Sequence, residues 1–121
     1  MENKTIATFD LSTKEGAKRL FNAQNAGGIS LKSLANGSEI EVEAVAIYNE
    51  VTEEFGQPQN VRVTALFGTD GIVYSSISNS VADGAEKLIP LFELFDNEPQ
   101  TVVVQRQKSK ADRDFITLMI K

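Results

Sequence analysis

Apolar and polar residues alternate through several stretches of the chain, which is the pattern of half-buried β-strands. The longest of these stretches spans residues 38–51, SEIEVEAVAIYNEV, and its apolar phase changes partway along. A β-bulge near residues 43–45 explains the change, because one extra residue moves every later side chain to the opposite face. Beyond the bulge, Ala46, Tyr48 and Glu50 are predicted to face outward.

Two further stretches, residues 60–68 and 72–78, flank a Thr-Asp-Gly turn and predict a β-hairpin. A two-residue turn would pair Phe67 with Tyr74, whereas a three-residue loop that ends in a left-handed glycine would pair Phe67 with Val73. The second register separates apolar from polar side chains more cleanly, so we prefer it. Its apolar face holds Val61, Val63, Ala65, Phe67, Val73 and Ile77. Its polar face, which we expect to point outward, holds Arg62, Thr64, Leu66, Tyr74, Ser76 and Ser78.

The spacing of apolar residues changes to three and four between residues 80 and 95, which predicts an amphipathic helix. Ser80 and Asp83 form its N-terminal signal. Pro90 lies within the helix and should kink it or split it in two. The apolar stripe consists of Val81, Ala85, Leu88, Phe92 and Phe95.

The first part of the chain carries a weaker pattern. Residues 6–9 predict a short strand, and Ser12 with Glu15 marks the start of a helix that runs to about residue 24. This helix should bury Ala17, Leu20 and Phe21. Turn-forming residues then dominate as far as Gly37. The segment could cover a sheet edge, self-associate or contact a ligand, and its composition does not choose among these roles.

After this N-terminal segment the predicted order is three strands, a helix, and two strands at residues 101–107 and 114–120. A long bent first strand and a helix between strands 3 and 4 are typical of the five-stranded OB-fold barrel. We therefore predict a mainly β protein with one domain, residues 1–121. Residues 38–121 form the OB-fold-like barrel, and residues 1–37 form a strand–helix extension. A generic α+β sheet with the same order is the alternative.

Composition narrows the function. The chain has 121 residues, of which 41% are apolar, so it can form one domain core. It has no Cys and no His, and it carries neither a phosphate-binding loop nor a nucleophile motif. We therefore expect no enzymatic activity, no metal and no cofactor. The polar N-terminus and the short apolar runs predict a cytoplasmic protein that does not enter a membrane.

The net charge of −5 argues against a protein that coats duplex DNA by charge alone. However, four of the twelve basic residues fall within eight positions near the C-terminus. In an OB-type barrel these positions belong to the loop between the last two strands, which flanks the ligand face on strands 2 and 3. The basic cluster consists of Arg106, Lys108, Lys110 and Arg113.

Other side chains converge on the same predicted face. Arg62, Leu66 and Tyr74 lie on strands 2 and 3. Tyr48 lies at the outward end of strand 1, and Phe55 lies in the loop after it. Unpaired bases stack on aromatic rings while cations follow the phosphates, so this combination predicts a site for single-stranded nucleic acid. Each residue alone also has an ordinary structural interpretation, so the prediction depends on their convergence.

Four short blocks of the chain are distinctive: FNAQNAGG, LANG, AIYNEVTEEFG and DGIVYSSIS. Through them the chain resembles, over nearly its whole length, the small single-stranded DNA-binding proteins of Bacillus podophages that start replication from a protein primer. The resemblance implies an abundant early protein that coats strands displaced by the phage polymerase. It also implies that Tyr48, Phe55 and Tyr74 contact the bound strand, as tyrosines do in that family. Phe55 departs from the family pattern, which has tyrosine there, so a hydroxyl is lost.

The leading hypothesis is therefore a sequence-independent single-stranded DNA-binding protein that coats and protects displaced strands during phage DNA replication. Single-stranded DNA is the expected ligand, the phage DNA polymerase is a candidate partner, and the host cytoplasm is the expected location. We expect a monomer, with self-association left open. The alternative is a protein–protein interaction or structural module built on the same small barrel.

Overall fold

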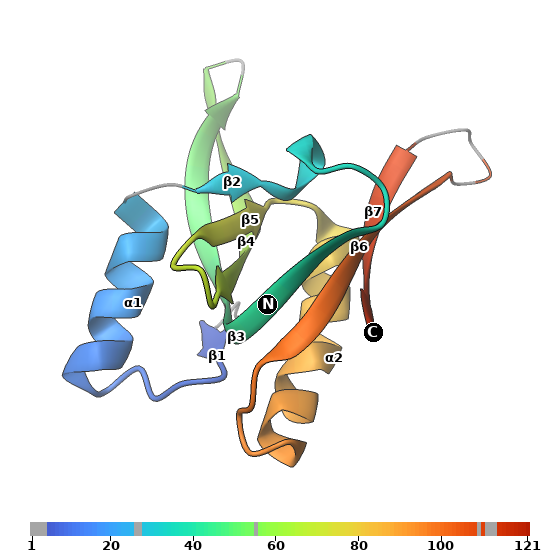
Figure 1. The fold of residues 1–121 in the computed structure, drawn as a ribbon. Helices are drawn as coiled ribbons and strands as arrows, with labels where there is room; N and C mark the ends of the chain where they lie inside the picture. Colours follow the sequence, from blue (N-terminus) through green and yellow to red (C-terminus); the bar gives the residue numbers. More distant parts are fainter. Residues whose placement is uncertain (1–4, 26–27, 55, 109, 111–113) are drawn as a thin grey trace.

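The computed structural model describes residues 5–25, 28–54, 56–108, 110 and 114–121. These residues form seven strands, two α-helices and one short 3-10 helix (Figure 1). The strands are β1 (Ile6–Ala7), β2 (Ile29–Ser30), β3 (Ser38–Glu54), β4 (Gln57–Gly68), β5 (Val73–Ser76), β6 (Gln100–Lys108) and β7 (Asp114–Ile120). The helices are α1 (Lys14–Asn25), the 3-10 helix η1 (Leu31–Ser33) and α2 (Asn79–Leu94).

All seven strands belong to one curled sheet in the order β2-β5-β4-β3-β6-β7, with β1 paired to β3. From β3 onward the order is the predicted one of three strands, a helix and two strands, and in the full count α2 lies between β5 and β6. The predicted five-stranded OB-fold-like barrel is confirmed only in part: the sheet is curled but has seven strands among the described residues, because the N-terminal extension contributes β1 and β2. Within the described residues no ladder joins β5 to β7, so the sheet is a half-barrel with an open seam.

The predicted β-bulge is confirmed. The β3–β4 ladder shifts between Val42 and Ala44, which leaves Glu43 without a partner across the strands. The stretch of β3 before the shift pairs with β6, and the stretch after it pairs with β4. The bulge thus lets one long strand bend and serve both halves of the sheet.

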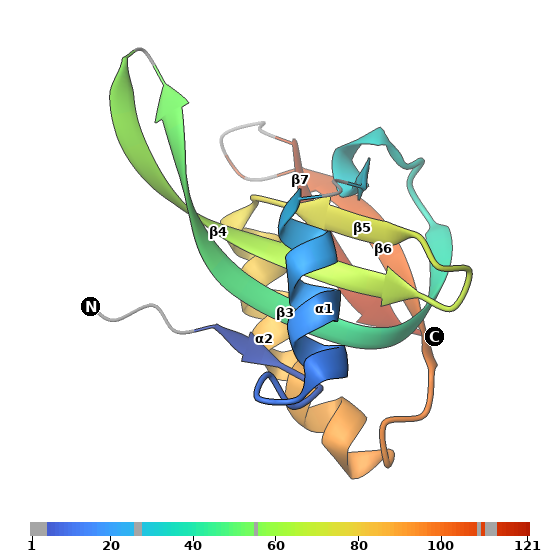
Figure 2. The ribbon, with the colours of Figure 1, turned by 90° about the vertical axis from the view of Figure 1, so that its left-hand side faces the viewer.

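The predicted hairpin register is also confirmed. Phe67 pairs with Val73, and Gly71 has the left-handed φ of +84° that the three-residue loop requires. The assignment of the two faces is wrong, however. In Figure 2, α1 crosses in front of β3, β4 and β5 while α2 lies behind the sheet, so both faces of these strands are covered.

The main core fills the inside of the half-barrel and packs against α2. It contains the hairpin face that was predicted to point outward: Leu66 is fully buried there, and Thr64 and Ser76 are buried as well. The cluster consists of Leu31, Ile40, Val42, Val45, Ile47, Leu66, Tyr74, Val81, Ala85, Leu88, Phe92, Val102, Val104 and Ile116. Pro90 lies within α2 without splitting it.

A second, smaller core lies between the sheet and α1, on the hairpin face predicted to line the barrel. Small side chains let the helix approach closely: Ala44, Ala46 and Ala65 on the strands meet Ala23 on the helix. Because a covering helix buries this face too, the polarity of the two faces could not tell inside from outside. The rest of the cluster consists of Tyr48, Val63 and Phe67, with Ala7, Phe9, Leu20, Val61 and Val73 half-buried beside it.

The face that α1 buries differs from the predicted one. Gly16 and Ala23 are buried, whereas Ala17 is exposed and Phe21 is 62% exposed. The capping residue is Thr13, one position after the predicted Ser12, because the Thr13 hydroxyl accepts a hydrogen bond from the Gly16 amide at 3.0 Å.

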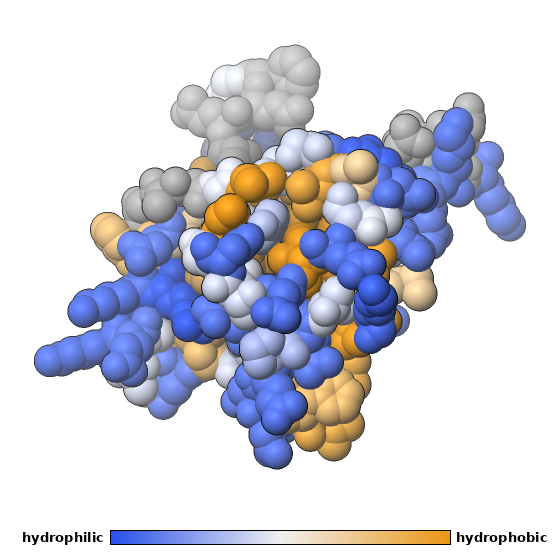
Figure 3. Space-filling model, in the orientation of Figure 1, coloured by the Kyte–Doolittle hydropathy of each residue, from blue (hydrophilic) through white to orange (hydrophobic). Residues whose placement is uncertain are grey.

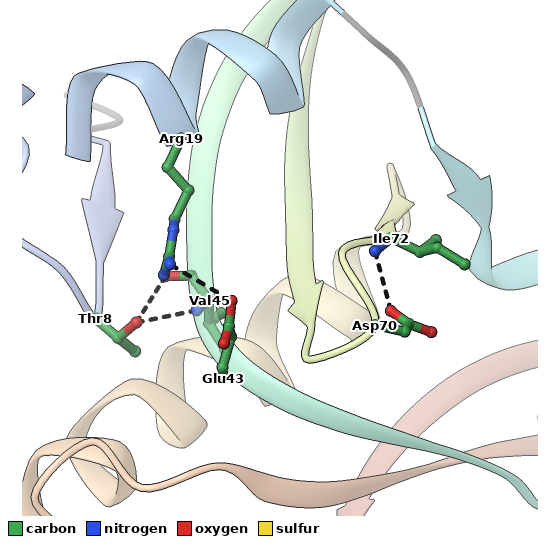
Figure 4. A network of polar contacts seen from close by, with 6 residues as sticks. All are labelled: Thr8, Arg19, Glu43, Val45, Asp70 and Ile72. Carbon is green, nitrogen blue, oxygen red and sulfur yellow. Dashed lines mark hydrogen bonds and ion pairs between the residues drawn. The ribbon is translucent and has the colours of Figure 1, made fainter. Parts of the chain in front are cut away.

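Polar contacts hold the extension against the sheet (Figure 4). Arg19 forms an ion pair with Glu43 at 3.4 Å, and its guanidinium lies 5.5 Å from the centre of the Phe67 ring. The Thr8 hydroxyl accepts a hydrogen bond from the Val45 amide at 3.0 Å. The extension is therefore an integral layer of the fold.

One buried hydroxyl leads to a stability prediction. Thr64 Oγ1 is buried and has no hydrogen-bond partner among the described residues. Valine has the same branched shape without the unpaired oxygen, so Thr64→Val should raise the free energy of unfolding by about 1–2 kcal/mol. Urea denaturation measures this change. Thr117, which accepts a hydrogen bond from Gln107 at 3.3 Å, is the control, and Thr117→Val should bring no gain. A loss of stability in Thr64→Val would contradict the conclusion that the Thr64 hydroxyl is buried without a hydrogen-bond partner among the described residues.

Candidate nucleic-acid interface

Tyr48 was predicted to face outward, and the structure places it inside, so this orientation is wrong. It lies on β3 beneath α1, is 3% exposed, and its hydroxyl donates to the Ala23 carbonyl at 3.4 Å. Burial raises the pKa of the Tyr48 phenol, and the nearby Glu50 carboxylate adds to the shift. In this conformation no nucleobase can stack on the ring.

Tyr74 and Leu66 are also inside, contrary to prediction. Leu66 is fully buried and Tyr74 is 9% exposed, in the core lined by α2. The Tyr74 hydroxyl donates to the exposed Asp70 carboxylate at 2.9 Å. This hydrogen bond raises the pKa of Tyr74. The Ile72 amide, whose hydrogen bond to Asp70 is drawn in Figure 4, and then the Tyr74 hydroxyl lower the pKa of Asp70, so both groups stabilise the turn.

Arg62 is half-buried and serves the fold. Its guanidinium forms an ion pair with Glu86 of α2 at 3.2 Å and donates to the side-chain oxygen of Asn49 at 3.4 Å. These contacts turn it toward α2, which lies behind the sheet in Figure 2.

The C-terminal basic cluster is the part of the predicted site that is exposed. Arg106 and Lys108 lie at the end of β6, and Lys110 follows in the hairpin loop; all three are exposed. Phe55 and Arg113 lie outside the described residues.

A groove of about 650 Å³ occupies the open seam of the half-barrel. Its floor is the buried Ile116 of β7, and its walls carry Phe115, half-buried, and Ile77, 56% exposed. Two exposed cations also line the groove, Lys32 and Arg106, which are 74 positions apart in the chain. None of the lining residues that the structure describes is acidic.

Three elements bring these residues together. In Figure 1, β2 and the turn after it lie between the β3–β4 hairpin and the β6–β7 hairpin. Lys32 of η1 therefore lines the groove together with Phe115 and Ile116 of β7. Leu31, fully buried in the main core, anchors η1. The Ser80 hydroxyl at the start of α2 donates to the Ile116 carbonyl at 2.9 Å. This hydrogen bond connects α2 to β7 beside the open seam.

The groove continues along the edge formed by β2 and β5. A second hollow of about 260 Å³ shares Lys32 and Ile77 with the first and adds three hydroxyl side chains. These are Ser30, Ser75 and Ser76. Figure 3 shows apolar surface near the middle of this face with hydrophilic side chains around it. We call the two hollows together the seam groove.

The N-terminus of α2 adds to the electrostatics of the seam groove. Ser78, the N-cap residue, lines the groove, and its side chain does not cap the backbone amides of the first helical turn. Its hydroxyl instead bonds the Ser80 hydroxyl at 2.8 Å. Because the first turn of α2 carries no acidic residue, the positive end of the helix dipole is not offset there.

Of the residues that line the seam groove, sequence reasoning chose only Arg106, and those it missed include Lys32, Ile77 and Phe115. Phe115 did carry a signal, since it lies on the outward phase of β7 with Thr117, opposite Ile116 and the other inward residues. Lys32 carried none, because the loop that holds it reaches the groove only through contacts distant in sequence.

The combination of cations, an aromatic ring and apolar walls suits a flexible strand with exposed bases. A family model described as phage single-stranded DNA-binding protein matches residues 1–121. The chain belongs to this family. Membership in this family of non-enzymatic DNA-binding proteins confirms both the resemblance and the expectation that the chain is no enzyme.

Individual relatives agree along the whole chain. The single-stranded DNA-binding protein of Bacillus phage B103 is 39% identical over 120 residues, which cover 99% of this chain and 98% of that protein. The corresponding proteins of Bacillus phages phi29 and PZA are each 40% identical over 122 residues, with the same coverage. No solved structure matches the chain significantly.

Other kinds of site were searched in the described part of the chain. It contains no group of three or more acidic side chains placed to hold a metal ion. None of its helices is both long and apolar enough to cross a membrane.

Proposed function

We propose that this protein coats single-stranded DNA during phage replication and holds the strand in the seam groove. The strands it protects are those displaced by the phage DNA polymerase, in the host cytoplasm, and the protein acts as a monomer. The observation that carries the proposal is the placement of Lys32 and Arg106 beside Phe115 and Ile77 in one open groove.

The groove chemistry supports binding that ignores base sequence. An aromatic ring and an apolar wall accept any base face, because every base has a π-surface. Lys108 and Lys110 extend the positive rim beyond the groove. A duplex hides its base faces, so a groove of this kind selects single strands.

The open seam is also consistent with an OB-type arrangement. In OB-folds the loops after strand 1 and strand 4 flank the ligand. Here the corresponding hairpins are β3–β4 and β6–β7, and the seam groove lies beside the second of them. We propose that the strand path follows this hairpin and not the buried tyrosines.

Binding assays with oligothymidine and a duplex of equal length, at about 20 mM and about 200 mM salt, test the proposed function. With about three phosphates neutralised, the slope of log affinity against log salt should be about −2, since each phosphate contact on a single strand adds about −0.7. The duplex should bind more weakly at both salt concentrations. Equal affinity for duplex and single strand would contradict the proposal.

A further inference from the structure

Arg106 has an unusual place in the seam groove. It lines the groove with Lys32, yet its guanidinium is already engaged by the protein. Nη2 donates to the carbonyl oxygens of Lys32 and of Leu34, the latter at 3.0 Å. A guanidinium nitrogen of this type carries two hydrogens, so these two acceptors use both donors of Nη2.

The same stretch of β6 forms two further hydrogen bonds with the chain that follows η1. The Arg106 amide donates to the Asn36 side-chain oxygen at 2.8 Å, and the Gly37 amide donates to the Val104 carbonyl at 2.8 Å. These contacts join residues about seventy positions apart in the chain. They fix the wall of the seam groove that carries Lys32.

Apart from β6, the wall is attached through the buried Leu31 and through β2, which pairs with β5 just before η1. η1 is a single turn of 3-10 helix, and Leu31 is its only buried residue. Local hydrogen bonds, such as the one from the Lys32 amide to the Ser30 hydroxyl at 3.3 Å, shape the turn but do not attach it to the sheet. Because the Lys32 carbonyl itself accepts a hydrogen bond from Arg106, the orientation of Lys32 depends on its contact with β6.

We infer that Arg106 is a positioning residue for strand binding: it fixes η1 so that Lys32 can contact a phosphate. This inference rests on the proposed function. It assigns the phosphate contact in this part of the groove to Lys32 and the alignment of that contact to the Arg106 guanidinium.

Arg106→Lys separates this role from a plain charge effect. The variant keeps the positive charge, but its side chain is one bond shorter, so its ammonium does not reach the position from which Nη2 donates to the Lys32 and Leu34 carbonyls. A residue that served as a simple phosphate cation would tolerate this change. A positioning residue would not, and the contact of Lys32 with the phosphate would be lost along with these two hydrogen bonds.

The experiment measures oligothymidine affinity by fluorescence anisotropy across salt concentrations for the full-length wild type, Lys32→Ala, Arg106→Lys and the double variant. We expect each single variant to bind about fivefold to tenfold more weakly than wild type. Each should lose about 0.7 from the magnitude of the salt slope. The double variant should bind no more weakly than Lys32→Ala, because both changes remove the same contact.

Two controls complete the design. Lys87→Ala removes an exposed charge on α2, outside the seam groove, and should leave affinity within about twofold of wild type. Asn36→Ala loosens the same wall without changing any charge and should mimic Arg106→Lys. If Arg106→Lys does not fold, as judged by circular dichroism, Asn36→Ala carries the test.

The inference would be overturned if Arg106→Lys kept the wild-type affinity and the wild-type salt slope. The same holds for Asn36→Ala when that variant carries the test. Additive losses in the double variant would overturn it too. If the wild type itself does not bind oligothymidine, the proposed function fails. Full wild-type affinity in Lys32→Ala would overturn the inference and the proposed path of the strand, but not the binding of single-stranded DNA by the protein.

Discussion

Replacing Lys32, Lys108 and Lys110 together with alanine should almost abolish strand binding at low salt. If each lysine neutralises one phosphate, the electrostatic part of the affinity varies with salt to the power of about −2. Taking that part as negligible near 1 M salt, the loss is on the order of a thousandfold at about 20 mM and thirtyfold at about 200 mM. Anisotropy titration of labelled oligothymidine measures both values, and the salt slope should approach zero.

A matched control separates the groove from the overall charge. Replacing Lys14, Lys18 and Lys87 with alanine also lowers the net charge from −5 by three, to −8, but changes residues on α1 and α2 that neither line the seam groove nor belong to the β6–β7 hairpin at its rim. This control should bind only modestly more weakly than wild type, because a more negative protein repels the DNA strand weakly over long distances. Equal losses in the two triple variants would mean that the strand is not held in the groove.

Tyr74→Ala should destabilise the protein strongly. The ring belongs to the main core with Leu66 and Leu31, and removing a buried aromatic side chain costs about 3–5 kcal/mol. This loss is a large share of the stability of a small domain, about 5–15 kcal/mol. Urea denaturation measures it. The outward placement expected from sequence predicts the opposite result, a folded protein that binds DNA more weakly.

Tyr74→Phe is the matched control for this prediction. It keeps the ring in the core and removes only the hydroxyl that donates to Asp70. The free energy of unfolding should therefore fall by far less than in Tyr74→Ala. If Tyr74→Ala were as stable as Tyr74→Phe, the placement of the ring in the core would be wrong.

The family itself was recognisable from four blocks of sequence, and the comparisons confirm it over the whole chain. The residues of the site were harder to predict. Of the nine chosen from the sequence, Arg106, Lys108 and Lys110 are exposed in or beside the groove, whereas Tyr48, Leu66 and Tyr74 are buried.

The sequence by itself determined the elements of this protein after residue 37. The order of strands and helix, the bulge at Glu43 and the pairing of Phe67 with Val73 all follow from periodicity and turn chemistry, which act between residues close in the chain. These features are local, so one sequence suffices to predict them.

Only the tertiary structure decided which surface is open. α1 covers one face of the hairpin, α2 covers the other, and the η1 wall reaches β6 across about seventy residues. Such placements depend on contacts between distant segments, and two buried faces look alike in a pattern of alternating residues. The groove beside Lys32 exists because of those contacts, and no local feature of the chain indicates it.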